Sequence, residues 1–399
     1  MKFRKDIIMR PKLRSEIDGD SERHADWLEL LFDLIFVAAI SQISLSLSAN
    51  YSFEGFLVSI PLFFVVWWGW VGHTFYLSRF GPDDLFHRAF TMAQMIIVAS
   101  LAINVRGAYG ADQVEFALSY ALLRFMLVFE YFRVGRNIPE ARDLARHYCI
   151  GFGLAASLWA VSIFLPSPWI YVIWAIALII DLLTPITAGE KHFKLPPNET
   201  HLPERFGLFI IILIGETIIS VVFKISSFGL TLTTDFMGLM GLIIAFCIWW
   251  AYFEESKGAE SRALQNKELL GKYQIWLYSH FPLLLGIVAV AAGIKNAISS
   301  NFWNFLPSNE VWLICISLAI AFISLNFIFL SSFTLRQCKN SIIQVLRLPY
   351  YIIILLIILT GFLGSILPTS LIIAILTVLC ILKVILSLRE PPEDDLCKL

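Results

Sequence analysis

Residues 27–37, Trp27-Leu-Glu29-Leu-Leu-Phe-Asp33-Leu-Ile-Phe-Val37, open the first long apolar segment of the chain. They place two carboxylates, Glu29 and Asp33, four residues apart in a run that otherwise suits hydrocarbon. On a helix this spacing stacks both side chains on one face, one above the other. A carboxylate at membrane depth is costly, so it normally faces the protein interior and has a function there. The segment therefore predicts a membrane-spanning helix that carries a buried acidic site.

The composition of the whole chain agrees with a membrane protein. Of its 399 residues, 58% are hydrophobic and only 15% are charged, whereas a soluble domain is about 45–50% apolar and about 25% charged. We predict an all-α fold, a polytopic transmembrane helix bundle. Its twelve apolar segments are each long enough to cross the bilayer as a helix. The predicted spans are 27–48, 53–77, 89–106, 114–134, 146–165, 168–187, 205–225, 231–253, 271–294, 310–335, 342–366 and 369–388.

The distribution of positive charge predicts the topology. With the N-terminus in the cytoplasm, 25 of the 30 Lys and Arg residues lie in cytoplasmic segments. The outer loops hold only Arg106, Lys224 and Lys295, while Arg124 and Lys383 lie inside predicted helices. This asymmetry obeys the positive-inside rule at every connection, so we expect both termini in the cytoplasm. Because no small-residue cleavage site follows the basic N-terminal stretch, we do not expect a cleaved signal peptide.

The chain also shows signs of an internal repeat. Asp33 precedes the pair Trp67-Trp68 by 34 residues, and Glu216 precedes the pair Trp249-Trp250 by 33. Because each half contains six helices, an even number, the two halves would have the same orientation and form a parallel 6+6 repeat. A chance match is the alternative, since the chain has 12 tryptophans. The predicted parts are a cytoplasmic basic arm at 1–26, a first six-helix transmembrane half at 27–187, a cytoplasmic linker at 188–204, a second six-helix half at 205–388 and a cytoplasmic tail at 389–399.

Ionisable residues at membrane depth form the candidate site. Arg124 falls near the middle of the fourth span, where an unpaired arginine is costly. We expect it to meet carboxylates from other helices, and the candidates are Glu29, Asp33, Asp181 and Glu216. Four acids against one arginine leave an excess of negative charge, which protons or a cation would balance. The alternative is a static ion-pair network that only fixes how the helices pack.

The histidines are weaker candidates. His280 precedes Pro282 in the ninth span, so a broken turn there could expose carbonyl groups, although a core histidine is the simpler interpretation. His24 and His201 stand just before the first and seventh spans, where they suit either an interfacial proton donor or a capping role. No phosphate loop, nucleophile triad or zinc motif is present, and the six cysteines are scattered. We therefore expect no metal and no cofactor, and an enzyme is not favoured.

Several of these stretches resemble one known family. Residues 29–37 resemble the opening motif of the bacterial low temperature requirement protein A (LtrA) family, and so does His201-Leu-Pro-Glu204-Arg205-Phe-Gly-Leu-Phe-Ile-Ile-Ile-Leu-Ile-Gly215-Glu216 at the half-way point. Arg79-Phe-Gly-Pro-Asp83-Asp84 also fits, although Gly81 stands where an acid is expected, and residues 249–253 and 278–283 fit as well. The recognisable motifs run from residue 24 to about 295.

The resemblance implies a multi-pass protein of the bacterial cytoplasmic (inner) membrane, in a family named for growth in the cold. It does not imply a molecular activity. It marks Glu204, Arg205 and Gly215 as family-level positions, together with Glu29, Asp33, Glu216 and His280.

Taken together, these features predict a secondary transporter or ion-translocating protein with its site between the two halves. Glu29, Asp33 and Glu216 would bind protons or a cation, Arg124 would be their counter-charge, and Asp181 would orient Arg124. His280 completes the site, and the accessory residues are His24, His201, Glu204 and Arg205. The alternatives are an intramembrane enzyme, a lipid-handling protein in cold adaptation, or a structural or regulatory protein that transports nothing. Expected partners are the lipid bilayer and a small solute or ion, without nucleic acid, and the sequence leaves an oligomer open.

Overall fold

The computed structural model describes residues 11, 13, 26–80, 84–198, 200–229, 231–255, 270–300, 302–332 and 347–388. Within these ranges all regular structure is helical, and the single β-bridge, between Leu13 and Phe80, stands alone. The predicted all-α fold is therefore confirmed. The predicted arm at 1–26, which includes His24, and the tail at 389–399 lie almost wholly outside the described residues.

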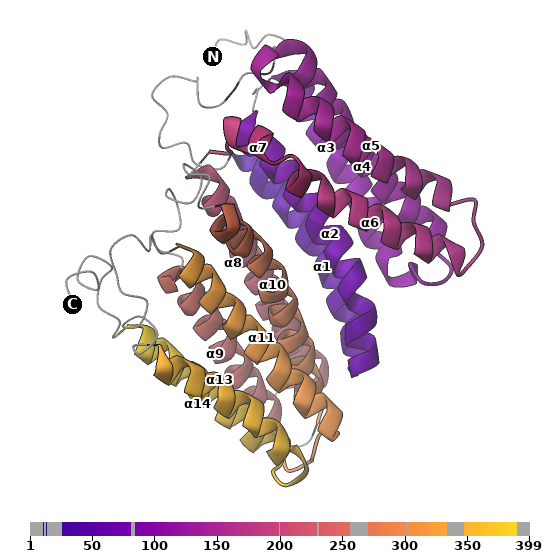
Figure 1. The fold of residues 1–399 in the computed structure, drawn as a ribbon. Coiled ribbons are helices and arrows are strands. Elements are labelled where there is room, and N and C mark those ends of the chain that lie inside the picture. The colour runs from indigo at the N-terminus through magenta and orange to yellow at the C-terminus, as the bar shows by residue number, and fades with distance from the viewer. Residues whose placement is uncertain are drawn as a thin grey trace, which may run out of the picture. The chain divides into compact units, whose positions relative to one another are not determined.

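A helix occupies each of the twelve predicted spans (Figure 1). In chain order they are α1 (Trp27–Ala49), α2 (Phe53–Arg79), α3 (Leu85–Asn104), α4 (Gln113–Asn137), α5 (Arg142–Ser162), α6 (Trp169–Thr187), α8 (His201–Phe228), α9 (Leu232–Glu255), α10 (Leu270–Ile298), α11 (Ser308–Ser332), α13 (Leu348–Thr360) and α14 (Thr369–Ser387). Short helices add α7 (Glu190–Lys194), η2 (Val105–Gly107), η3 (Pro139–Ala141) and η5 (Gly361–Ser365). Ten of the helices are long and apolar enough to cross a membrane, and α4 and α5, which are more polar, are the two exceptions among the long helices described. Both numbers, twelve helices in the predicted spans and ten that are apolar enough to cross a membrane, agree with a polytopic helical bundle.

Several helices begin earlier than their hydropathy predicts, and at two of them, α3 and α8, a polar side chain caps the start. Asp84 accepts a hydrogen bond from the backbone N–H of His87 at 2.7 Å and starts α3 at Leu85. Asn198 Oδ1 accepts from the backbone N–H groups of Thr200 and His201, at 3.1 and 3.0 Å, and α8 starts at His201. The second cap moves the start of α8 back by four residues from the predicted 205, which matters for the site below.

The described residues form two compact units. The first comprises residues 1–43 and 61–209, and the second comprises residues 44–60 and 210–399. In the first unit α4 packs against α3 and α5, and α5 packs against α6; in the second, α10 packs along α11 and α9 along α14 (Figure 1). The parallel repeat and the predicted domain limits stay predictions.

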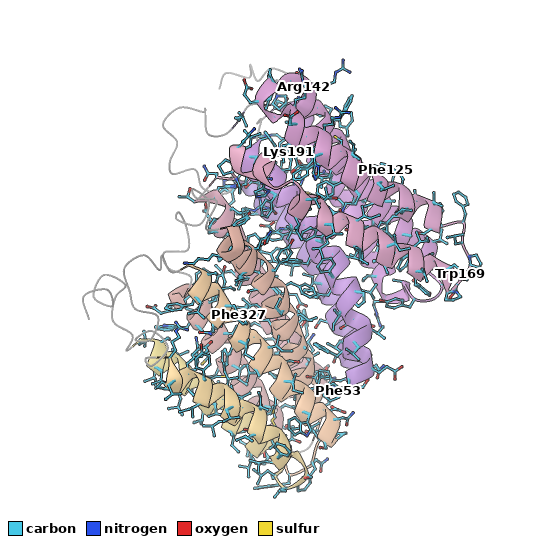
Figure 2. All side chains as sticks on the ribbon, viewed as in Figure 1. Phe53, Phe125, Arg142, Trp169, Lys191 and Phe327 are labelled. Carbon is cyan, nitrogen blue, oxygen red and sulfur yellow. The ribbon has the colours of Figure 1, made fainter. Side chains whose placement is uncertain are left out.

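Large apolar side chains are exposed over both units. Phe125, Trp169 and Phe327, labelled in Figure 2, are 40%, 63% and 48% exposed. Apolar surface on this scale is unfavourable in water and suits contact with lipid chains. Within the first unit, Arg142 and Lys191 lie at one end and Trp169 at the other (Figure 2). The basic end is the one that the positive-inside rule assigns to the cytoplasm.

Candidate functional site

The two carboxylates that open α1 are buried in the first unit. Glu29 is 5% exposed and Asp33 is 0% exposed. Because α1 is helical from Trp27, the two side chains lie one turn apart on one face. Carboxylates removed from water in this way need a partner that carries positive charge.

Two residues of α8, also one turn apart, supply that charge. His201 Nε2 and Arg205 Nη1 each lie 2.8 Å from Glu29 Oε2. Arg205 Nη2 pairs with Asp33 Oδ1, and it lies 3.4 Å from the backbone oxygen of Glu29. The planar guanidinium therefore bridges both carboxylates, which the single amine of a lysine could not do in the same way. We call Glu29, Asp33, His201 and Arg205 the α1–α8 charge cluster.

The burial of Arg205 corrects an expectation from the sequence. There, Arg205 and His201 are accessory residues at the membrane surface, and Arg124 is the counter-charge of Glu29 and Asp33. In the structure Arg205 is 0% exposed and His201 is 1% exposed. Because Asn198 starts the helix early, Arg205 lies a full turn, about 6 Å, farther along α8 than hydropathy indicates.

Trp70 of α2 covers the cluster on one side. Its indole Nε1 donates a hydrogen bond to Asp33 Oδ1 at 2.6 Å. The ring packs on Phe206 and Phe209 of α8, with centroid distances of 4.8 and 4.2 Å. These apolar rings lower the local dielectric, so the charges beside them interact more strongly than they would in water. No sequence pattern distinguishes Trp70 from the other tryptophans, and sequence reasoning did not select it.

Charge balance makes the cluster sensitive to a single proton. Two carboxylates and one guanidinium leave one negative charge when the imidazole of His201 is neutral. One added proton, on the imidazole or on a carboxyl group, makes the cluster neutral, and neutrality is favoured where water is excluded. Asp33 Oδ2 has no hydrogen-bond partner among the described residues, so an acceptor is available there. The net charge of the α1–α8 charge cluster would therefore depend on a single proton.

Arg124 belongs to a different buried pair. Its Nη2 lies 2.7 Å from Asp181 Oδ2, and its Nε donates to the Tyr120 hydroxyl at 2.9 Å. That hydroxyl donates to Asp181 at 3.0 Å, and Arg124 Nη2 also donates to the backbone oxygen of Trp68 at 3.2 Å. The sequence predicts Asp181 as the residue that orients Arg124, and the two do meet. One arginine against one carboxylate is neutral without any added proton.

The second unit holds Glu216 and a buried lysine. Ser220 Oγ donates to Glu216 Oε1 at 2.8 Å. Lys295 counts as an outer-loop residue in the sequence, yet α10 continues through it to Ile298 and it is 4% exposed. Its Nζ donates to Ser44 Oγ at 3.2 Å. Because Glu216 and Asp33 belong to different units, their predicted joint site stays a prediction.

The remaining candidates have simpler roles. His280 is 0% exposed, with Nδ1 bonded to the backbone oxygen of Trp276 at 2.7 Å and Nε2 to the Tyr252 hydroxyl at 3.2 Å. Helix α10 continues through Pro282, so the broken turn expected there is absent from this described stretch. His280 is therefore a satisfied core histidine, while Glu204 lies half-buried in the first turn of α8. Within the described residues no three His, Cys, Asp or Glu side chains converge as metal ligands.

Comparison with known proteins assigns the chain to a family. The family described as bacterial low temperature requirement A protein (LtrA) matches residues 24–385. The chain belongs to the LtrA family. The match extends well past residue 295, where the recognisable motifs end, and includes the last three long helices. A curated relative can be compared with it as well: the uncharacterized protein RA0937 of Rhizobium meliloti (strain 1021) is 24% identical in a 299-residue alignment that covers 68% of this chain and 72% of that protein.

Proposed function

We propose that this LtrA-family protein is a proton-coupled secondary transporter, and that the α1–α8 charge cluster binds the coupling proton. The observation that supports the proposal is the burial of two carboxylates, Glu29 and Asp33, against a single arginine, Arg205. With one added proton the net charge of this cluster is zero, and when that proton leaves the net charge is −1. Intramembrane acids and histidines with this property are typical of proton-driven transporters.

The cluster lies near the starts of α1 and α8, which would let its proton exchange with the cytoplasm. Glu29 and Asp33 lie in the first two turns of α1, and His201 and Arg205 lie in the first two turns of α8. In the predicted topology both helix starts are cytoplasmic. His201 joins Glu29 at 2.8 Å, and imidazole exchanges protons near neutral pH. A proton bound between Glu29 and Asp33 would therefore exchange with the cytoplasm by way of His201.

The proposal is tested in proteoliposomes loaded with a pH-sensitive dye. A potassium gradient with valinomycin drives proton entry, and candidate co-solutes, beginning with Na⁺, K⁺ and choline salts, are added in separate runs. We expect proton flux in the wild type and a loss of about tenfold or more in Asp33→Asn, since the neutral amide cannot carry the proton. Glu54→Gln is the matched control, because Glu54 is an exposed acid at the start of α2.

The outcomes separate the proposal from its alternatives. Flux equal to that of protein-free liposomes under every gradient would contradict a transporter, and would favour an enzyme or a lipid-handling protein. Equal flux in the wild type and in Asp33→Asn, both folded, would reduce the cluster to a structural ion pair.

A further inference from the structure

A second buried polar cluster lies among α2, α3 and α4 of the first unit. It consists of His73, Gln94 and Glu130, which are 2%, 1% and 3% exposed. Gln94 Nε2 donates to Glu130 Oε2 at 3.2 Å, and His73 Nδ1 lies 3.7 Å from that same oxygen. Each residue comes from a different helix, so only the folded unit assembles the set. We call it the His73–Glu130 cluster.

Most polar atoms of this cluster lack a hydrogen-bond partner among the described residues. These atoms are His73 Nδ1 and Nε2, Gln94 Oε1 and Glu130 Oε1. Thr91 Oγ1, one turn before Gln94 on the same face of α3, also lacks a hydrogen-bond partner among the described residues. Each unsatisfied buried group costs about 1–3 kcal/mol, and native proteins pair nearly all of them with protein or with ordered water. These atoms are therefore available to bond a small polar ligand.

The separation of the two titratable groups indicates which ligand fits. The 3.7 Å between His73 Nδ1 and Glu130 Oε2 exceeds a hydrogen bond, so a proton passes between the two groups only through a third one, and water is the smallest that can serve. A carboxylate and an imidazole are also the side chains that carry protons within membranes. A metal ion fits less well, because His73 and Glu130 are joined by no third side chain of the His, Cys, Asp and Glu types in the described residues.

Neighbouring charges leave the pair free to hold one proton. Arg133, three residues after Glu130 on α4, has its Nη2 3.4 Å from Asp84 Oδ2. Among the described residues, Glu130 also interacts electrostatically with Tyr76 of α2, His87 of α3 and Tyr131 of α4, and Glu29 of α1 acts on His87. With Arg133 and Asp84 balancing each other, Glu130 is the net charge of the cluster, and one proton neutralises it.

We propose that His73, Gln94 and Glu130 form a second proton-binding site, with a water bridging the imidazole and the carboxylate. A proton arriving from water forms an O–H bond at Glu130, which becomes a neutral carboxylic acid. The bridging water then accepts that proton while giving one of its own to His73 Nδ1. Carboxylic acid and imidazole become carboxylate and imidazolium, and the water is regenerated. Gln94 holds Glu130 in place through its amide hydrogen bond.

The site also lies beside α1. The His73 ring stacks on Phe32 with a centroid distance of 4.1 Å, and Phe32 lies between Glu29 and Asp33 along α1. A proton released from His73 would therefore be delivered next to the α1–α8 charge cluster. This delivery step rests on the proposed function, whereas proton binding at the His73–Glu130 cluster does not.

Infrared difference spectroscopy of the purified protein in nanodiscs tests the binding site directly. Spectra are recorded at about pH 5 and about pH 8, on either side of neutral pH. We expect a carboxylic acid C=O band that is lost in Glu130→Gln and shifted in frequency in His73→Gln. Glu115→Gln is the matched control, since Glu115 is an exposed acid on the same helix, and it should leave the band unchanged. Thermal unfolding of each variant confirms that it is folded.

Each outcome bears on a separate claim. A spectrum identical in wild type and Glu130→Gln would overturn the second site, as would a band that shifts with Na⁺ at constant pH, because the ligand would then be a cation. Proton flux in liposomes that falls about tenfold or more in Asp33→Asn but is unchanged in a folded Glu130→Gln would remove the delivery step alone. Absence of flux in the wild type would overturn the proposed function, and the infrared result would still decide the site.

Discussion

Replacing Arg205 by methionine tests whether the α1–α8 charge cluster depends on one guanidinium. Arg205 is 0% exposed and contacts both Glu29 and Asp33, so its removal leaves two buried carboxylates without their main counter-charge. Removing one partner of a buried pair typically costs about 3–5 kcal/mol. Because two acids lose the same partner here, we expect the free energy of unfolding to fall by about 5 kcal/mol, the upper end of that range.

The assay is reversible unfolding in mixed detergent micelles, followed by tryptophan fluorescence. Arg106→Met is the control, since Arg106 is exposed, and it should change stability by less than about 0.5 kcal/mol. Adding Asp33→Asn to Arg205→Met removes one uncompensated charge and should recover about 1–3 kcal/mol, the usual coupling between contacting residues. A folded Arg205→Met protein within about 0.5 kcal/mol of the wild type would refute the pairing.

Two further predictions concern Gly72 and His192 of the first unit. Gly72→Ala should destabilise by about 1–3 kcal/mol, because an added Cβ would lie 2.6 Å from Arg124 Nη1, whereas Gly215→Ala, with no atom within 4 Å, should be neutral or stabilising in the same unfolding assay. His192, in the short helix α7 outside the spanning helices, has a pKa well below its usual range because burial and then the Arg79 guanidinium disfavour its charged form. In the unfolded chain this histidine has an ordinary pKa of about 6.5 and binds a proton below that pH, whereas in the folded chain it stays neutral. The free energy of unfolding should therefore fall as the pH drops below about 6.5, by up to about 1.4 kcal/mol per pH unit. His192→Gln should flatten that part of a pH series of unfolding curves, and an unchanged slope would show that other groups set it.

The helices themselves were largely predictable, because hydropathy reports depth in the membrane directly. Twelve apolar runs became twelve helices, with ends displaced by a few residues where Asp84 or Asn198 forms a cap. The partners of the buried charges were not predictable in the same way. Depth does not specify which face of a helix a side chain occupies, nor which neighbour it meets.

Arg205 illustrates why the partners of a buried charge were not predicted, and which sequence pattern pointed to them. Polar neighbours such as His201 and Glu204 depress the hydropathy at the start of α8, so the arginine resembles a surface residue. Yet His201 and Arg205 have the same four-residue spacing as Glu29 and Asp33. Two helices that each present a charged pair one turn apart can form matched contacts, which is the arrangement in the structure. Lys295 was misplaced for the same reason, since it lies near a helix end.

The number of carboxylates that each arginine meets distinguishes Arg124 from Arg205. Arg124 meets one carboxylate, Asp181, so the pair is neutral at every pH at which both are ionised and has no use for an added proton. Arg205 meets two carboxylates, and neutrality there requires a proton. A static network that only fixes helix packing would be expected to balance its charges, as Arg124 does, because an unbalanced charge is costly at membrane depth. The excess carboxylate beside Arg205 is therefore a feature that packing alone does not explain, and it makes Asp33 the residue on which the proposed proton coupling depends.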